Sequence, residues 1–223
     1  MFLHSRAAGP GRRSALPASP LLLHGALPPL LALLLPLLLL PLLATPAAAH
    51  HLMETFALKE GPLAGLLSGI GHPLLGPDHL LFLLALGLVG LVQRLRWVLA
   101  LLAVGLTATG LGLLLPNLPG AEALVALSLV LVGLVVIQRL PVWTLLPAFA
   151  LHGYVLSDAV SGWQAASVAW YLLGLLISQG ALLWLALTLV QRWRAGIAPA
   201  RLMLAAGVLI GVGSTFAWSA LVP

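Results

Sequence analysis

A group of ionisable side chains interrupts an apolar stretch of the chain. Residues 72–79 read His-Pro-Leu-Leu-Gly-Pro-Asp-His, which places two imidazoles and a carboxylate beside two prolines. Ionisable groups at membrane depth are costly, so their presence favours a functional role. Imidazole with carboxylate is a ligand set that suits divalent transition metals such as nickel, cobalt and zinc. The segment therefore predicts that the protein handles a metal ion within the membrane.

The spacing of the two histidines requires a bend. On a straight helix His72 and His79 would share a face but lie about 10 Å apart along the axis. Donor atoms around one metal lie about 2 Å from it, so a straight helix would hold these two rings poorly on one ion. Two prolines and Gly76 between them supply the bend that would bring the rings together.

The same prolines predict a broken element. Pro73 and Pro77 each remove a helix hydrogen bond, which leaves the carbonyl groups of Gly69 and Pro73 without their usual partners. Such breaks persist at membrane depth only where protein or a wet cavity satisfies the backbone. The apolar segment 62–92 is also too long for one simple span, at about 46 Å against a hydrocarbon core of about 30 Å. We expect a helix broken near 73–77, or a re-entrant piece.

Composition sets the class of protein. The chain has 223 residues, of which 61% are hydrophobic and 7% charged, and its mean hydropathy is +1.14. These values are typical of an all-α, polytopic helical membrane protein. The net charge of +5 does not indicate nucleic-acid binding, because the arginines lie singly or in pairs between apolar spans. The absence of cysteine excludes disulfides and thiolate metal sites.

The N-terminal region predicts a cleaved secretory signal peptide over residues 1–49. A basic start, a Leu/Pro-rich run and a run of alanines up to Ala49 form the expected pattern. The alternative is a retained anchor helix, which the several prolines of the run disfavour. Residues 50–61 then form a short external segment, and residues 62–223 form the transmembrane domain.

Six spans are expected in that domain. They cover residues 62–92, 97–115, 121–138, 141–159, 165–190 and 201–221. Arginines follow the first, third and fifth spans, and neither lysine nor arginine follows the second or fourth. The positive-inside rule then places the odd-numbered exits in the cytoplasm and both mature termini outside. A cleaved signal peptide also leaves the N-terminus outside, so two independent patterns predict one topology.

Six candidate metal ligands lie in or beside these spans: His72, Asp78, His79, Glu122, His152 and Asp158. Counting residues inward from the arginines places them between mid-depth and the outer face, as expected of a site loaded from outside. Three of them have simpler interpretations. His152 alone would suit a hydrogen-bonded interior histidine, Glu122 a helix start that favours acids, and Asp158 a loop acid.

These motifs resemble the HupE/UreJ family of nickel permeases over roughly residues 47–222. The family has a His, five residues, then Asp-His, as in 72–79. Further matches are His50-His51, Glu122 with Ser128 and Gly133, and His152-Gly153-Tyr154 with Asp158. Two positions depart from the pattern. Leu156 stands where several relatives have His or Tyr, and Asp158 where they have Glu.

The resemblance implies a secondary transporter and not an enzyme. Its expected cargo is Ni²⁺, with Co²⁺ as the alternative, imported across the bacterial inner membrane for maturation of a nickel hydrogenase or urease. No resident cofactor is expected, and no nucleotide-binding motif is present in the sequence. Two other functions stay open. One is an intramembrane zinc hydrolase that uses His72, His79 and His152, and the other is a metal-binding accessory protein that does not transport.

Overall fold

The computed structural model describes residues 59–91, 95–116 and 118–222. Every regular element in these ranges is a helix, which confirms the expected all-α class. The predicted signal peptide and most of the external segment 50–61 lie outside the described residues, so both stay predictions.

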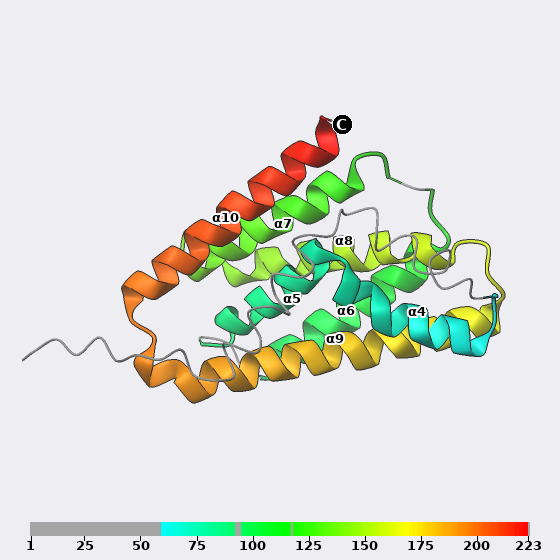
Figure 1. Ribbon diagram of the computed structural model, residues 1–223, viewed down its shortest axis with the longest axis horizontal. Helices are drawn as coiled ribbons and strands as arrows, with labels where there is room; N and C mark the ends of the chain where they lie inside the picture. Colours follow the sequence, from blue (N-terminus) through cyan, green and yellow to red (C-terminus); the bar gives the residue numbers. More distant parts are fainter. Residues whose placement is uncertain (1–58, 92–94, 117, 223) are drawn as a thin grey trace, which may run out of the picture.

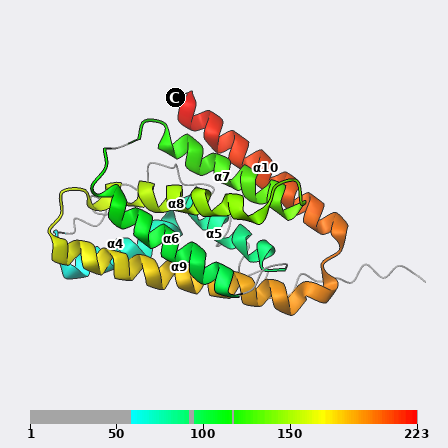
Figure 2. The ribbon, with the colours of Figure 1, turned by 180° about the vertical axis from the view of Figure 1, so that it is seen from behind.

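The helices follow one another with short connections. They are α4 (Pro62–Leu75), α5 (Pro77–Val89), α6 (Leu95–Gly112), α7 (Ala121–Val136), α8 (Leu145–Leu156), α9 (Ala165–Trp193) and α10 (Pro199–Leu221). Short 3-10 helices are η2 (Val142–Thr144), η3 (Asp158–Val160) and η4 (Arg194–Gly196). In Figure 1, α9 runs along the molecule with α4 beside it, and α7 pairs with α10 on the opposite side. Figure 2 views the molecule from behind. In this view α6 lies in front of α5 and between α8 and α9.

The expected break in the first apolar segment is confirmed. α4 and α5 meet at a bend of 73°. Gly76 joins them with extended backbone angles (φ −79°, ψ 109°), and Pro77 occupies the first turn of α5. Proline suits that position because the first helical N–H has no partner within the helix.

The carbonyl group freed by Pro73 finds a partner on α9. The Oγ of Ser178 donates a hydrogen bond of 3.1 Å to the carbonyl of Gly69, the group that Pro73 deprives of its helical donor. α4 runs parallel to α9, because Gly65 lies against Ser167 and Gly69 against Ser178. The close approach of α9 thus satisfies the broken backbone.

Contacts of glycine residues show how α6 and α8 run relative to each other. α6 and α8 run parallel, since Gly105 lies against Phe149 and Gly112 against Ser157. Small residues of this kind let helix backbones approach closely in membrane proteins.

α7 and α10 run antiparallel. Gly133 of α7 lies against Ala206 near the start of α10, and Ala126 of α7 lies against Gly213 further along α10. These three relations are the ones that the six-span topology requires.

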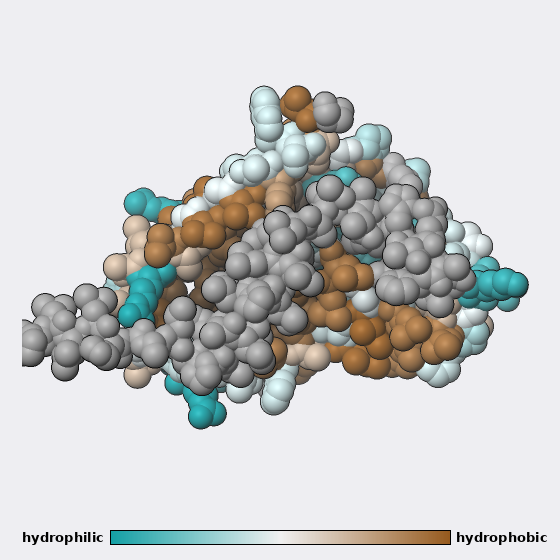
Figure 3. All heavy atoms as spheres, in the orientation of Figure 1, coloured by the Kyte–Doolittle hydropathy of each residue, from teal (hydrophilic) through white to brown (hydrophobic). Residues whose placement is uncertain are grey.

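Charge separates along the axis of the bundle. The described arginines all lie in, or within a few residues of, the connections that follow α5, α7 and α9: Arg96, Arg139, Arg192, Arg194 and Arg201. At the other end, the backbone N–H of Gln164 donates to Glu60 Oε1 at 2.6 Å and joins the starts of α4 and α9. Figure 3 shows hydrophilic groups at both ends of the long axis and apolar surface between them. The bilayer normal is thus expected to follow the long axis.

Helix length departs from the expected spans in the middle of the chain. α9 and α10 are long and apolar enough to cross a bilayer, and the bent α4–α5 pair adds one more candidate. α8 has only 12 residues, or about 18 Å, because η2 and η3 replace the ends of the expected span 141–159. α7 is similarly short, with 16 residues. The count of six spans stays a prediction.

Labelling of single cysteines tests the topology, because the natural chain has none. Ser161→Cys lies in the connection before α9 and Ala195→Cys in η4, and both positions are exposed. We expect a membrane-impermeant maleimide to label Ser161→Cys in intact spheroplasts, and to label Ala195→Cys only after permeabilisation. The cysteine-free parent is the control, and the reverse pattern would contradict the predicted orientation.

Candidate metal centre

Three buried imidazoles meet where the first segment breaks. His72 comes from the last turn of α4, His79 from the first turn of α5 and His152 from α8, with exposed fractions of 1%, 4% and 4%. The ring centroids of His72 and His79 lie 5.7 Å apart, and those of His79 and His152 lie 4.9 Å apart. A straight helix would hold the first two rings about 10 Å apart along its axis. The bend therefore brings together rings that sequence spacing alone would separate.

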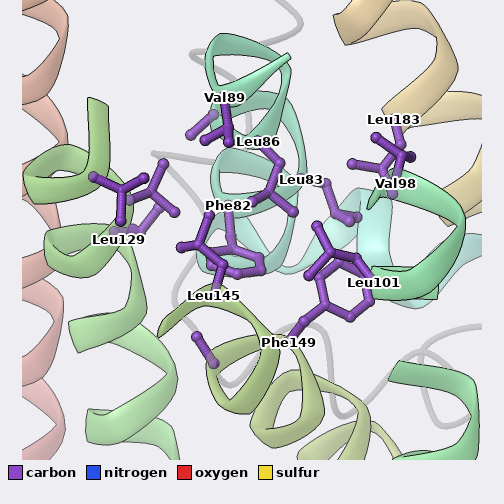
Figure 4. Close-up of a cluster of buried hydrophobic side chains, with 14 of the residues drawn as sticks. Phe82, Leu83, Leu86, Val89, Val98, Leu101, Leu129, Leu145, Phe149 and Leu183 are labelled. Carbon is purple, nitrogen blue, oxygen red and sulfur yellow. The ribbon is translucent and has the colours of Figure 1, made fainter. Parts of the chain in front are cut away.

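Aromatic packing holds the His152 ring in place. The Phe82 ring stacks on it at a centroid distance of 3.9 Å and an interplanar angle of 15°. Phe82 also lies 5.8 Å from Phe149, one turn before His152 on α8. Figure 4 shows Phe82 at the centre of the hydrophobic core, between Leu129 on one side and Leu101 on the other. Contacts from several helices thus fix this ring.

A chain of hydrogen bonds sets which ring nitrogen carries the proton in His152 and in His79. Ser128 Oγ donates to the Val125 carbonyl at 2.5 Å, so its only proton is used. His152 Nε2, 2.6 Å from the same oxygen, must therefore donate to it. In a neutral His152 ring the lone pair then lies on Nδ1, which faces His79 Nδ1 at 2.8 Å. His79 Nδ1 donates in turn, and the lone pair of a neutral His79 ring lies on Nε2.

Asp78 lies beside this group at the start of α5. Its Oδ1 accepts a hydrogen bond of 2.9 Å from the backbone N–H of His79, and the residue is half-buried. The first turn of a helix favours such an acid. Gly76 leaves room for both side chains, because a Cβ there would lie 2.8 Å from His79 Cδ2 and 3.4 Å from Asp78 Oδ1.

The structure separates the six candidate ligands into two groups. Asp78 and the three histidines gather at the break. Glu122 is exposed in the first turn of α7, and Asp158 is exposed at the start of η3. The Tyr154 hydroxyl donates to the Pro116 carbonyl and ties the end of α8 to the connection before α7. The two exposed acids therefore lie at one end of the bundle, and a metal-binding role for them stays a prediction.

The donor atoms, as placed, do not surround one position. Within the described ranges no group of three or more His, Asp or Glu side chains is arranged to hold a metal ion. His79 and His152 instead join their Nδ1 atoms in a direct hydrogen bond. An ion bound through both of these atoms would have to replace that hydrogen bond.

Three residues around the break have no counterpart among the sequence predictions. Phe82 is the only aromatic residue among the apolar residues of α5, but nothing in the sequence shows that its ring stacks on a histidine of another helix. Ser178 had an indirect signal, since the freed Gly69 carbonyl needs a donor. Gln179 is an amide in the middle of the 29-residue apolar helix α9, and it is buried.

The fold and the buried cluster define a class: a multi-helix membrane protein with imidazoles gathered at a broken helix. The profile of the family described as "HupE / UreJ protein" matches residues 37–216. The chain belongs to the HupE/UreJ family, and the resemblance seen in its motifs is confirmed. Members are permease-like accessory proteins associated with nickel and cobalt transport. No curated protein and no solved structure matched the chain.

Replacing Gly76 tests the packing of His79. We expect Gly76→Ala to lower Ni²⁺ affinity about 10- to 100-fold, the range seen when metal ligands lose their support. The added Cβ would displace the His79 ring, whereas the backbone angles at this position suit alanine. Equilibrium dialysis of the detergent-purified protein measures the affinity. Gly207→Ala is the control because a Cβ there meets nothing within 4 Å, and equal affinities of the two variants would refute the argument.

Removing the Ser128 hydroxyl tests the hydrogen-bond chain. We expect Ser128→Ala to lower Ni²⁺ affinity about tenfold or more, because His152 loses the acceptor that fixes its tautomer and orientation. Ser219→Ala is a matched control. Both serines donate to a carbonyl three residues earlier, and Ser219 is exposed at the far end of α10. If both variants bind Ni²⁺ equally well, Ser128 does not support the site.

Proposed function

We propose that the protein is a secondary importer of Ni²⁺, with Co²⁺ as the alternative cargo, in the bacterial inner membrane. The observation that carries this proposal is the meeting of three buried imidazoles from α4, α5 and α8 at a break in an apolar helix. Membership of a family associated with nickel and cobalt transport supports it. The cargo would serve maturation of a nickel hydrogenase or urease, the metabolism with which the family is associated.

The chemistry of the donors suits this cargo. Imidazole binds nickel, copper, iron and zinc well, whereas hard cations such as Mg²⁺ prefer oxygen ligands. Three imidazoles in the apolar interior thus favour a transition metal over the more abundant Mg²⁺. Asp78 contributes a negative charge at the same place and partly offsets the two charges of the ion.

Binding would exchange one set of contacts for another. As an ion approaches, the hydrogen bond between His79 and His152 gives way to bonds from ring nitrogens to the metal. The Nε2 of His152 keeps its hydrogen bond to Ser128, so this ring offers Nδ1. His79 offers Nε2 in the tautomer set by the chain, or Nδ1 after losing that proton to the other nitrogen. The first choice needs no proton shift, and the second needs one.

The direction of movement follows from the charges at the two ends. Exposed Glu122 and Asp158 lie at the end predicted to be outside, where they would attract cations. The membrane potential, negative inside, favours inward movement of a divalent cation by about 4.6 kcal/mol per 100 mV. The potential is therefore a sufficient driving force without ATP.

Uptake of ⁶³Ni²⁺ into proteoliposomes with an inside-negative potassium-diffusion potential tests the proposal. We expect His72→Ala, Asp78→Asn and His79→Ala each to lower the initial rate at least tenfold, because the histidine variants each remove an imidazole donor and Asp78→Asn removes the negative charge at the break. Thr109→Val is the control. The exposed fraction of Thr109 is 1%, and its hydroxyl donates to the Gly105 carbonyl within α6.

The location of the metal after uptake separates transport from the alternative functions. Metal that resists an external chelator and is released by an ionophore is in the lumen, which neither a hydrolase nor a storage protein would achieve. Near-normal uptake in any two of the three variants would refute the site. Binding by the wild-type protein without accumulation would instead favour an accessory role.

A further inference from the structure

A lone amide is buried in the long helix that lies beside the break. Gln179 of α9 has an exposed fraction of 3%, and its Oε1 atom has no hydrogen-bond partner among the described residues. It belongs to a stripe at four-residue intervals whose other members, Tyr171, Leu175 and Leu183, are fully buried. Almost every buried polar atom in a native protein is hydrogen-bonded, so an exception calls for an explanation such as a bound ion.

Contacts of α9 with the broken helix place this amide at the level of the break. One residue before it, Ser178 bonds to Gly69, which precedes His72 by three residues. Two turns after it, Ala186 lies against Gly87 of α5, which follows His79 by eight residues. Gln179 thus lies between the contacts that α9 makes with α4 and those it makes with α5.

Two hydrogen bonds agree with this placement. The Tyr171 hydroxyl, two turns before Gln179 on α9, donates at 2.7 Å to the carbonyl of Leu156, which follows His152 by one turn on α8. The His152 ring itself bonds to His79, and His79 lies between the residues of α4 and α5 that α9 contacts through Ser178 and Ala186. The buried amide therefore lies near the depth of the imidazole cluster.

We propose that the amide oxygen of Gln179 is a further ligand of the transported metal, supplied by α9 to the ion held by the three histidines. This inference rests on the proposed function and adds a donor that the sequence motifs do not contain.

A neutral oxygen donor suits a transporter. An amide oxygen completes the coordination of the ion without adding negative charge, whereas another carboxylate would hold a divalent cation more tightly. Movement through a membrane protein requires binding that is favourable enough to admit the ion but weak enough to release it. A glutamine at this place satisfies both conditions.

The test uses Co²⁺ as a probe, because its visible absorption bands report the number and type of its ligands. Full-length protein in detergent is titrated with Co²⁺, and its thermal unfolding is measured without metal. We expect Gln179→Leu to lower Co²⁺ affinity about tenfold or more and to change the visible bands, while Tm stays equal or rises because an unpaired buried amide is removed. Gln179→Glu keeps an oxygen donor and adds charge, so affinity should be retained or increased.

Gln191→Leu is the matched control, an exposed glutamine on the same helix, and should bind Co²⁺ as the wild-type protein does. Unchanged affinity and bands in Gln179→Leu would overturn the inference, and so would a lower Tm with unchanged bands, which would mean a structural role. Co²⁺ binding that depends on Gln179 in a protein that fails to accumulate metal in vesicles would refute only the transport function. Failure of the wild-type protein to bind either Co²⁺ or Ni²⁺ would overturn both.

Discussion

A backbone carbonyl in apolar surroundings must find a donor, and this requirement organises the molecule around the break. Pro73 deprives the Gly69 carbonyl of its helical partner, and Ser178 of α9 supplies the replacement. The bent segment is therefore stable only with α9 packed closely along α4, which the glycines of both helices permit. The bend in turn sets the positions of His72 and His79. One unsatisfied group thus links the packing of two helices to the geometry of the candidate site.

In the imidazole cluster, some contacts hold the rings in place and another hydrogen bond occupies the atoms that could bind a metal. His152 makes two kinds of contact that fix it, stacking on Phe82 and a hydrogen bond to Ser128, and it comes from a different helix than the other two rings. His79 has its backbone N–H bonded to Asp78 and its ring bonded to His152. The rings are thus held by the surrounding helices on one side and by a replaceable hydrogen bond on the other. This combination supports the proposed transport of a metal cargo.

Sequence reasoning succeeded where local chemistry decides the structure. Proline removes a backbone hydrogen bond wherever it lies in a helix interior, so the break near Gly76 and the meeting of His72 with His79 could be predicted. The short length of α8 could not be predicted, because hydropathy does not distinguish a full span from a shorter helix flanked by 3-10 turns. Tertiary packing also decided which donor reached the Gly69 carbonyl. Several serines in the sequence would have served equally well.

The balance of charge along the axis has a consequence for a cation that moves through the bundle. Full negative charges, on Glu60, Glu122 and Asp158, are exposed at the end where α4, α7 and α9 begin. At the break the donors are mainly neutral imidazoles, with Asp78 as the acid among the predicted ligands. Coulomb attraction grows sharply in a medium of low dielectric constant, so several buried carboxylates would bind a divalent ion too tightly to release it. Neutral donors inside and charged groups outside therefore allow attraction over a distance together with reversible binding at the break.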